Sequence, residues 1–398
     1  MTQQSIHPDF KLSFDNTEIA FQAKTNNDLK RSYWLFKAIG YNWLVSMAPT
    51  LVNTSFKLRL PIKGIVRATV FRQFCGGESM DTCDQTIQAL HTYGIGSILD
   101  YSVEGKEEEA EFEYTANEII ATIEKAKTDK RIPFCVFKVT GVARFGLLNK
   151  VSNRDSLTSE EQSELDKVKL RIEHICEKAF QHSVRIFIDA EESWIQEAID
   201  GLAREMMLKY NKNTAIVFNT AQMYRHDRLD FLKQSYEDSL KHNYYLGMKL
   251  VRGAYMEKER ERAIQLGYEN PIQPDKEATD RDYNEGLKFC TDKLDRISLC
   301  AGTHNEASSM LLVKLMKERG VANNDSRIYF SQLFGMSDHI SYNLSYAGFN
   351  VAKYLPYGPV QAVMPYLLRR AQENTSVKGQ SGRELTLITS ELKRRSLL

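Results

Sequence analysis

From residue 94 onward, short segments rich in β-branched and other apolar residues alternate with longer amphipathic segments. This alternation predicts β–α units whose strands pair in parallel. The eight candidate strands cover residues 96–101, 133–139, 184–189, 215–219, 245–251, 297–301, 327–331 and 350–354. Amphipathic stretches lie between them at 159–181, 194–210, 228–243 and 308–319. No Gly-x-Gly-x-x-Gly follows the first strand, so an α/β fold of the distorted (β/α)8, or TIM-like, barrel type is favoured over an open doubly wound sheet.

Residues 1–90 lack this alternation and show mostly helical spacing of apolar residues, so they are predicted to form a helical N-terminal extension. A barrel with C-terminal helices is predicted to follow over residues 91–398. No long linker rich in Pro, Gly or Ser separates the two regions, so we expect the extension to pack on the barrel. Outside the β–α units, helices are expected to begin at the Asn27-Asp28 cap, near Ser79, at Gly358-Pro359 and at Gly382.

Charge and cysteine usage exclude several classes of protein. Across 398 residues, 53 Lys and Arg nearly balance 52 Asp and Glu, and no basic stretch interleaves with aromatic residues, so nucleic acid is not an expected partner. The six cysteines are scattered without a Cys-x-x-Cys pair, which predicts a reducing compartment. The histidines show no metal-ligand spacing, so we expect no protein-bound metal.

The N-terminal sequence shows neither a secretory nor a transit pattern, and no apolar run is long enough to span a membrane. We therefore expect a cytoplasmic protein. A peripheral contact with the inner face of the membrane stays open, because the amphipathic tail that ends in Lys393-Arg394-Arg395 is a candidate anchor. Packing of this tail on the barrel is the alternative.

Polar residues recur where the predicted strands end, and the carboxyl ends of the strands carry the active site in parallel barrels. Any one of these residues is by itself as consistent with a solvated loop, but a ring of them is typical of a barrel active site. The ring comprises Asp100, Lys138, Asp189, Glu191, Glu192, Gln222, Lys249, Arg252, Tyr255, Thr303, His304, Asn305, Gln332 and Tyr354.

Some of these positions have a second interpretation. Lys138 shares a strand face with Phe134 and Val136. If this face points into the barrel, Lys138 is expected to meet a carboxylate or phosphate there. The alternative is an edge lysine whose ammonium reaches solvent. Asp189, Glu191 and Glu192 have two interpretations. One is that a carboxylate among them pairs with a substrate amine or an arginine. The other is that they cap the N-terminus of the helix that follows.

Arg369 and Arg370 lie on a helix that follows the last strand. Adjacent helical arginines usually serve a solvated face, but two guanidinium groups at this place can hold a carboxylate through paired hydrogen bonds. Glu373 lies four residues after Arg369 and can orient it.

Seven sequence stretches together resemble the proline dehydrogenase family of flavoenzymes. Their residues are most similar to the eukaryotic-type monofunctional branch of that family. They are Leu-Asp-Tyr-Ser-Val-Glu (99–104), Phe-Ile-Asp-Ala-Glu (187–191), Lys-Leu-Val-Arg-Gly-Ala-Tyr (249–255), Gly-Tyr-Glu-Asn-Pro-Ile (267–272), Thr-His-Asn (303–305), Gln-Leu-Phe-Gly-Met (332–336), and Tyr-Leu-Pro-Tyr-Gly-Pro-Val through Pro-Tyr-Leu-Leu-Arg-Arg-Ala-Gln-Glu-Asn (354–374). The similarity runs in order over roughly residues 95–395.

The resemblance implies an FAD-dependent oxidation of L-proline to Δ1-pyrroline-5-carboxylate by hydride transfer, with electrons passed to a quinone, as the first step of proline catabolism. It implies that Lys138, Arg369 and Arg370 bind the proline carboxylate, that Asp189 and Glu373 support them, and that Leu250, Tyr255, Leu333, Tyr354 and Tyr366 wall the ring. It implies that FAD is held by Gln222, Lys249, Val251, Arg252, Gly253, Lys276, Thr279, Thr303, His304 and Asn305. Glu104 resembles an acidic gate that pairs with one arginine.

One departure concerns the flavin contact. The bacterial bifunctional pattern begins Arg-Leu-Val-Lys, whereas this chain has Lys249 first and Arg252 fourth. A lysine cannot reproduce the planar fork of an arginine, so the contact near Lys249 is open.

Three alternatives remain. The substrate is 4-hydroxyproline if the residue that faces the far carbon of the ring leaves room for a hydroxyl, but Tyr354 is expected there and favours proline. In the second alternative, the protein is an aldolase-like barrel in which Lys138 forms a Schiff base with the substrate. In the third alternative, the barrel has no catalytic activity and serves for interaction. The oligomeric state and the quinone site cannot be read from the sequence.

Overall fold

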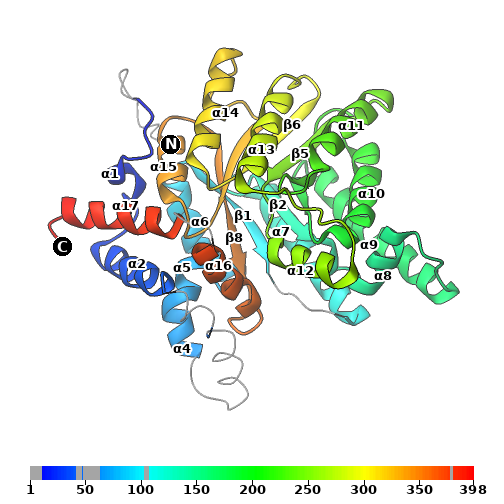
Figure 1. The fold of residues 1–398 in the computed structure, drawn as a ribbon, viewed down its shortest axis with the longest axis horizontal. Coiled ribbons are helices and arrows are strands. Elements are labelled where there is room, and N and C mark those ends of the chain that lie inside the picture. The colour runs from blue at the N-terminus through cyan, green and yellow to red at the C-terminus, as the bar shows by residue number, and fades with distance from the viewer. Residues whose placement is uncertain (1–10, 42–46, 48–62, 103–106, 377–379) are drawn as a thin grey trace. The chain divides into compact units, whose positions relative to one another are not determined.

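The computed structural model describes residues 11–41, 47, 63–102, 107–376 and 380–398. Eight parallel strands form a closed barrel in chain order, with helices between successive strands (Figure 1). The strands are β1 (Ile95–Tyr101), β2 (Phe134–Lys138), β3 (Arg185–Asp189), β4 (Val217–Gln222), β5 (Leu246–Val251), β6 (Ile297–Gly302), β7 (Ile328–Leu333) and β8 (Val351–Tyr357). The predicted (β/α)8 barrel and all eight predicted strands are confirmed.

Four strands extend beyond their predicted carboxyl ends, β6 by one residue, β7 by two, and β4 and β8 by three each. In β4 and β8, pairing rather than local propensity sets the length. β4 continues to Gln222, which pairs with Val251 of β5. β8 continues to Tyr357, which pairs with Tyr101 of β1. Polar residues and a proline at these ends hid the apolar pattern by which strands are recognised.

Helices precede, connect and follow the barrel strands. Before β1 come α1 (Thr17–Ala20), α2 (Asn26–Ile39), α4 (Lys63–Val66), the π-helix η1 (Arg67–Phe71), α5 (Arg72–Phe74), the 3-10 turn η2 (Asp81–Cys83) and α6 (Asp84–His91). Between strands lie α7 (Glu109–Thr128), the 3-10 turn η3 (Val139–Gly141), α8 (Phe145–Asn153), α9 (Ser159–Gln181), α10 (Ser193–Tyr210), α11 (Arg228–Lys241), α12 (Met256–Leu266), α13 (Lys276–Thr291), α14 (Glu306–Glu318) and α15 (Asp338–Tyr346). After β8 come α16 (Met364–Ser376) and α17 (Gln380–Arg394).

Three predicted helix starts were wrong by a few residues, and the smallest difference is that α17 begins at Gln380 rather than at Gly382. The cap of α2 is Thr25, whose Oγ1 accepts the N–H of Asp28 at 3.2 Å, rather than the predicted Asn27-Asp28 pair. α16 begins at Met364 rather than at Gly358-Pro359, because the carbonyl of Pro359 first accepts the N–H groups of Ala362 and Val363 in a turn.

Chain contacts divide the protein into two compact units, one of residues 1–104 with 332–398 and one of residues 105–331. These units follow contacts in space, whereas the predicted division after residue 90 follows the order of the chain. The first unit therefore combines the N-terminal helices with the C-terminal helices.

In the unit of residues 105–331, an aromatic layer fills the barrel interior. Phe134 stacks on Phe187 with ring centroids 4.4 Å apart, and the rings of Phe218 and Tyr329 meet Phe134 edge-on at 5.5 and 4.9 Å. These four rings come from β2, β3, β4 and β7, so they mark the inward face of each strand. Because side chains alternate along a strand, Lys138 lies on the same inward face of β2 as Phe134, as predicted.

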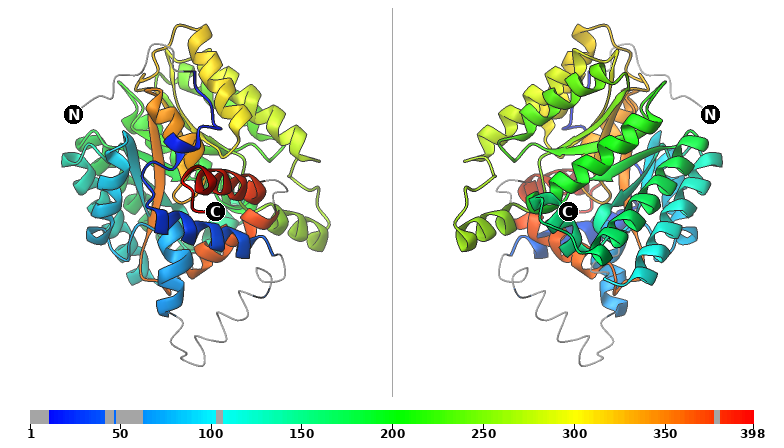
Figure 2. Two further views of the ribbon diagram at one scale, coloured as in Figure 1. Left: turned by 90° about the vertical axis from the view of Figure 1, so that its left-hand side faces the viewer. Right: turned by 90° about the vertical axis from the view of Figure 1, so that its right-hand side faces the viewer.

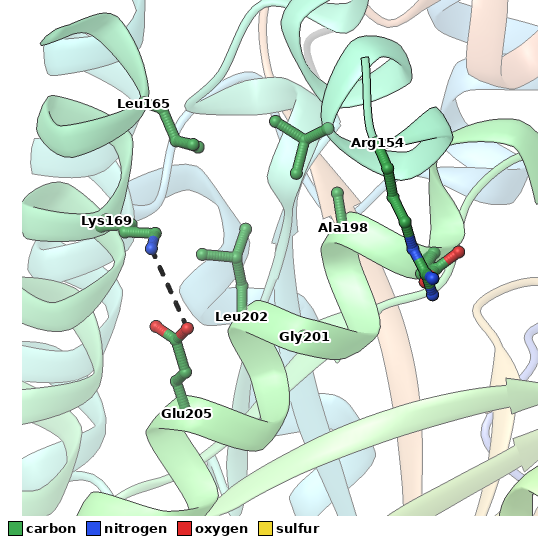
Figure 3. Close-up of a pocket in the computed structure, with 9 residues that line it drawn as sticks. Arg154, Leu165, Lys169, Ala198, Gly201, Leu202 and Glu205 are labelled. Atoms are coloured by element: carbon green, nitrogen blue, oxygen red, sulfur yellow. Dashed lines mark hydrogen bonds and ion pairs between the residues drawn. The ribbon is translucent and has the colours of Figure 1, made fainter. Parts of the chain in front are cut away.

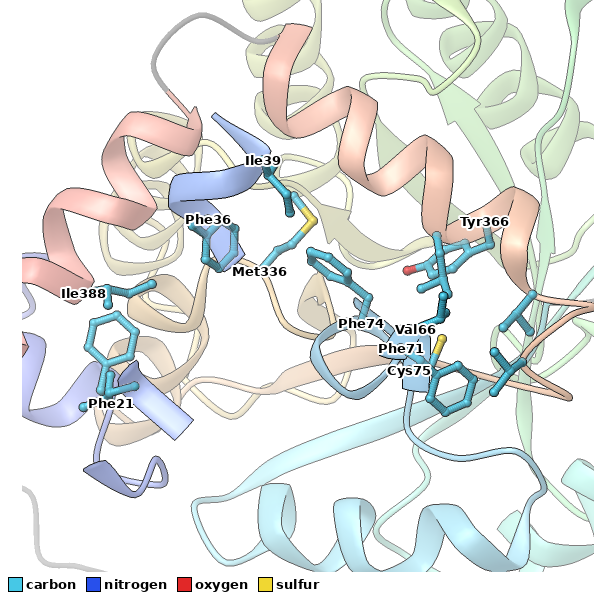
Figure 4. Packing of buried hydrophobic residues seen from close by; sticks show 14 of the residues in the cluster. Phe21, Phe36, Ile39, Val66, Phe71, Phe74, Cys75, Met336, Tyr366 and Ile388 are labelled. Atoms are coloured by element: carbon cyan, nitrogen blue, oxygen red, sulfur yellow. The ribbon is translucent and has the colours of Figure 1, made fainter. Parts of the chain in front are cut away.

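In the other unit, the N-terminal and C-terminal helices share one apolar core (Figure 4). Phe36 of α2 meets Phe74 of α5 edge-on, with centroids 6.4 Å apart, and both belong to the same buried cluster as Tyr366 of α16 and Ile388 of α17. α2 and α17 lie side by side (Figures 1 and 2). Residues 11–41 are thus held by apolar packing against the end of the chain.

The basic tail is part of this packing. The guanidinium of Arg395 bonds Glu391 at 2.7 Å and donates to the carbonyls of Phe21 and Lys24 at 2.9 and 2.8 Å. Arg394 also pairs with Glu391. These contacts of the tail are with the N-terminal segment and its own helix, whereas the packing alternative expected the barrel.

Gly247 of β5 tests the interior packing. A Cβ there would lie 2.4 Å from the carbonyl oxygen of Val217 and 2.8 Å from the ring of Phe218. Gly247→Ala should therefore lower the free energy of unfolding by about 1–3 kcal/mol in urea denaturation, since neither neighbour has room to move. Gly201→Ala is the control: nothing lies within 4 Å of its Cβ, so this helical change should be neutral or stabilising. Equal stability of the two variants would contradict the described interior.

Candidate active site

The ends of β2 to β6 in the unit of residues 105–331 carry most of the predicted site residues. Lys138, Asp189 and Gln222 are the last residues of β2, β3 and β4. Lys249 and Val251 lie at the end of β5, and Thr303 directly follows β6. The carboxyl ends of parallel strands lie at one end of a barrel, so these positions share one rim.

Lys249 forms an ion pair with Asp189 inside the barrel. The Lys249 side chain is 4% exposed, and its ammonium lies 5.1 Å above the ring centroid of Phe187. In the β2–β3 register, Asp189 stands beside Lys138. Asp189 thus carries a negative charge between two lysines, and the charge of Lys249 is balanced within the protein.

Arg252 is the centre of a polar cluster after β5. Its guanidinium donates to Asp280 at 2.8 Å, to the hydroxyl of Thr303 at 2.7 Å and to the hydroxyl of Ser308 at 2.9 Å. The same group lies 4.4 Å from the ring centroid of Tyr283. These contacts join β5 to the start of α13, the end of β6 and the start of α14.

The cluster continues at the starts of α13 and α14. Lys276, at the first position of α13, pairs with Asp280. Burial acts to raise the pKa of Asp280, but its bonds to Lys276 and Arg252 hold that pKa below its usual value. At α14, Asn305 accepts the N–H of Ser308 at 2.9 Å and donates its own N–H to Thr303 at 3.0 Å. Four predicted cofactor contacts are therefore brought together here: Arg252, Lys276, Thr303 and Asn305.

Gly253 allows a close approach of backbone to an aromatic ring. Its φ is +135°, and a Cβ would lie 2.5 Å from the ring of Tyr224. The N–H of Tyr224 donates to the carbonyl of Arg252 at 2.7 Å, which holds the two segments together. Only glycine meets both demands without strain.

Glu191 is buried behind the ends of β2 and β4. Its carboxylate accepts the N–H of Thr140 at 3.0 Å and also the hydroxyl of Thr140. Its carbonyl accepts from the side chain of Gln222 at 2.6 Å. Burial raises the pKa of Glu191 to about 7, and the charge of Glu192 adds to this rise, whereas Thr140 and Lys138 oppose it. Glu191 is therefore a carboxyl that titrates near neutral pH.

The helix-cap interpretation of Asp189, Glu191 and Glu192 was wrong. Glu192 occupies the N-cap position of α10 without a side-chain cap bond and pairs with Lys258 instead. The cap comes from Glu259 of α12, which accepts the N–H and the hydroxyl of Ser193, each at 2.6 Å. Glu259 was not predicted from the sequence, because nothing in the charged run of residues 257–262 distinguishes it.

Several predicted residues of this unit have less definite surroundings. Leu250 is fully buried on the strand face opposite to Lys249, and a Cβ at Gly286 of α13 would lie 3.1 Å from it, so Leu250 packs outward toward that helix. Tyr255 is half-buried at the start of α12. His304 is half-buried between Thr303 and the first residue of α14.

The remaining predicted residues belong to the other unit. Leu333 and Tyr366 pack in its apolar core, and the guanidinium of Arg370 lies 5.2 Å from the ring centroid of Tyr366. Tyr354 is buried in β8, and its carbonyl accepts the N–H of Phe334 at 2.8 Å. Arg369 is half-buried on α16. Glu104 and the side chain of Glu373 lie outside the described residues.

Buried polar groups hold the loop that follows Leu333, the last residue of β7. Gln73 donates to the carbonyl of Gly335 at 2.7 Å, and Lys353 donates to that of Met336 at 2.7 Å. The N–H of Ser337 donates to Glu384 of α17. A Cβ at Gly335 would lie 1.9 Å from the carbonyl oxygen of Gln73, so the glycine of Gln-Leu-Phe-Gly-Met is required by close packing. These supporting residues were not predicted from the sequence.

A cavity of about 240 Å³ on the outer helices is not this site (Figure 3). It is lined by residues of α8, α9 and α10, among them Leu165 and Leu202. Its charged residues are already paired, Arg154 with Glu197 and Lys169 with Glu205. Among the described residues, no helix is long and apolar enough to cross a membrane, and no group of three or more His, Cys, Asp or Glu is placed to hold a metal ion.

The residues present fit an anionic, flat cofactor. Arg252 and Lys276 supply positive charge, and the first turns of α13 and α14 add N–H groups, which is a favourable environment for a diphosphate. Gln222 adds a side-chain amide at a neighbouring strand end, whereas the space beside Gly253 is occupied by the ring of Tyr224.

A closed parallel barrel with ionisable groups at its strand ends defines the enzyme-bearing class of α/β barrels. The family model of proline dehydrogenase matches residues 83–383, and the chain belongs to this family. It is a family of oxidoreductases that act on the CH–NH group of donors.

The relatives agree with this assignment. The chain is 33% identical to "Proline dehydrogenase 1, mitochondrial" of Dictyostelium discoideum, over 97% of this chain and 75% of that protein. It is 31% identical to the protein of the same name in Arabidopsis thaliana, over 96% of this chain and 87% of that protein. It is 34% identical to the carbapenem biosynthesis protein CarD of Pectobacterium carotovorum subsp. carotovorum, over 81% and 83%. The predicted likeness to the eukaryotic-type branch is confirmed.

The fold is similar to that of a solved bacterial protein. Proline utilization A from Bdellovibrio bacteriovorus superposes with a TM-score of 0.70 at 17% identity, over 92% of this chain. The chain spans 37% of that longer protein, and the likeness is one of fold alone.

The Lys249–Asp189 pair gives a prediction about stability. Lys249→Met should lower the free energy of unfolding by up to about 3–5 kcal/mol, because it removes the ammonium paired with the Asp189 carboxylate and leaves Lys138 as its neighbouring cation. Adding Asp189→Asn should recover most of that loss in urea denaturation, since both charges are then removed. In the exposed pair of Arg154 and Glu197, the control Glu197→Gln should change stability by less than about 1 kcal/mol. Additive losses for Lys249→Met and Asp189→Asn would contradict the pair.

Proposed function

We propose that the protein catalyses the FAD-dependent oxidation of L-proline to Δ1-pyrroline-5-carboxylate, the first step of proline catabolism. The observation that carries the proposal is the family match over residues 83–383. The names of the Dictyostelium and Arabidopsis relatives support proline as the substrate.

Basic groups hold the substrate carboxylate in this proposal. Lys138, Arg369 and Arg370 bind it, and Asp189 and Glu373 orient them. An anchored carboxylate fixes the ring relative to the acceptor, and a part of the substrate that does not react thereby contributes orientation to the reaction. The inward face of Lys138 on β2 supports its part. The meeting of Lys138 with the two arginines stays a prediction.

Apolar and aromatic side chains wall the ring. We assign this role to Tyr255, Leu333, Tyr354 and Tyr366, and leave Leu250 out because it packs toward α13. A walled pocket excludes water and disfavours the ammonium form of the substrate. This matters because the nitrogen must be unprotonated when hydride leaves the adjacent carbon.

The cofactor site is the Arg252 cluster with its neighbours. Arg252 and Lys276 face the diphosphate, supported by Thr279, Thr303, His304 and Asn305, while Gln222, Lys249, Val251 and Gly253 lie nearer to the ring system. When bound, FAD supplies the two-electron acceptor that the protein's own side chains lack. Lys249 is already paired with Asp189. In this proposal Lys249 therefore contributes an ion pair, rather than an unpaired cation, beside the flavin ring system.

A quinone takes the electrons onward in this proposal, at a site that we do not assign. The relatives from Dictyostelium and Arabidopsis are named mitochondrial, and the expected cytoplasmic location of this chain stays a prediction.

The visible spectrum of the purified protein tests the proposed function. Protein reconstituted with FAD should be yellow, and its flavin absorption should bleach when L-proline is added without oxygen, because hydride moves to the flavin. D-Proline is the control. A colourless protein, or a flavin that L-proline does not bleach, would overturn the proposal, and borohydride trapping of a keto substrate on Lys138 would favour the aldolase alternative.

Tyr354 tests the choice of substrate. If its ring occupies the space beside the far carbon of proline, Tyr354→Ser should raise kcat/KM for 4-hydroxyproline relative to proline by about tenfold, a gain of about 1.4 kcal/mol in discrimination. Steady-state dye reduction with both substrates measures this. Tyr342→Phe, which changes a buried tyrosine on α15 of the same unit, should leave the ratio unchanged. An unaltered ratio in Tyr354→Ser would remove Tyr354 from the pocket wall.

A further inference from the structure

Glu191 connects two residues to which the proposed function gives different tasks. Its carboxylate holds the segment directly after Lys138 through the N–H and hydroxyl of Thr140, at 3.0 Å for the N–H. Its carbonyl holds the side chain of Gln222 at 2.6 Å. Its own N–H donates to Gln196 of α10 at 2.9 Å, so the residue is fixed from three sides.

We propose that Glu191 is a positioning residue: its carboxyl fixes the end of β2, and with it Lys138, and its charge opposes that of an incoming carboxylate. This inference rests on the proposed function, because it takes Lys138 as the group that binds the substrate carboxylate. Glu191 itself touches neither substrate nor cofactor, and acts through Thr140 and Lys138.

Burial makes the charge state of Glu191 responsive near neutral pH, where its pKa stands at about 7. The charged groups that face it are Lys138 on β2, which favours its anion, and Glu192, which disfavours it. Glu192 is itself paired with Lys258 of α12. Thr140 after β2, Gln222 of β4 and Gln196 of α10 are neutral.

The sign of the effect follows from linkage. A bound carboxylate beside Lys138 brings negative charge toward Glu191, which raises the pKa of Glu191 further. Ligand binding near pH 7 must then take up a proton, and affinity must fall as pH rises through about 7. Proline is a poor probe for this, because its amine also titrates.

The probe is tetrahydrofuran-2-carboxylate, which keeps the five-membered ring and the carboxylate but has oxygen in place of the nitrogen. Its binding to the FAD-loaded full chain is measured by the change in the flavin spectrum and by calorimetry in two buffers of different ionisation enthalpy. The second measurement counts protons taken up on binding and does not depend on turnover.

Two variants separate charge from position. Glu191→Gln keeps an acceptor for Thr140 and removes the charge, so its affinity should be independent of pH between about pH 6 and about pH 9, with no proton uptake. Glu191→Ala removes the support, so its affinity should be about tenfold weaker at every pH. Wild type should lose affinity severalfold over the same range.

Glu259→Gln is the matched control. Glu259 is also fully buried and also accepts an N–H and a hydroxyl from one residue, Ser193, but it does not contact Thr140 or Gln222 through the bonds described. It should lose stability in thermal denaturation while it keeps the pH dependence and the proton uptake of wild type.

Persistence of pH dependence and proton uptake in Glu191→Gln would overturn the proposal, and so would their loss in Glu259→Gln. A wild-type affinity that does not vary with pH would overturn it as well. Bleaching of the wild-type flavin by proline in the same samples reports on the proposed function separately, so failure of one claim is distinguishable from failure of the other.

Discussion

All eight strands of the barrel run in the same direction, and the chemistry of the rim depends on this constraint. Lys138, Asp189 and Gln222 end three neighbouring strands, and Lys249 reaches Asp189 from the next strand along. A barrel rim that collects so many charges must balance them internally. It does so by pairs: Lys249 with Asp189, Arg252 and Lys276 with Asp280, and Glu192 with Lys258. Pairing keeps these groups in place, and at Asp280 it holds the pKa below its usual value although burial acts to raise it.

The packed side chains below the strand ends fix the positions of the residues at the rim. The stacked rings of Phe134 and Phe187 fix β2 and β3 directly below Lys138 and Asp189, and Gly247 makes room for Phe218 in the same layer. In the other unit, Gln73, Lys353 and Glu384 fix the loop that follows Leu333. Residues 11–41 and 63–102 thus contribute to a core in which Leu333 and Tyr366 are packed, which gives the N-terminal helices a structural part in shaping that loop.

The strand pattern could be predicted from the sequence because apolar runs and turn residues are local signals, whereas the ends of β4 and β8 were missed because they depend on pairing with β5 and β1. Strand ends also predicted which polar residues stand at the rim. Their partners could not be predicted: Glu259 caps α10 from 66 positions away in the chain, and no local pattern encodes such a contact. The helix-cap interpretation of Glu191 failed for the same reason, since its partner Thr140 lies on another strand end. Leu250 shows a limit of carrying residues over from a family, because strand alternation turns it toward α13.

The central claim is that Lys138 and the two arginines of α16 hold one carboxylate beside a flavin. A crystal structure of the FAD-loaded protein with bound tetrahydrofuran-2-carboxylate tests this most directly. We predict carboxylate oxygens within hydrogen-bonding distance of the Lys138 ammonium and of the guanidinium groups of Arg369 and Arg370, with the ring between Tyr354 and the flavin. A ligand carboxylate bound away from Lys138, or a flavin bound away from Arg252, would contradict it.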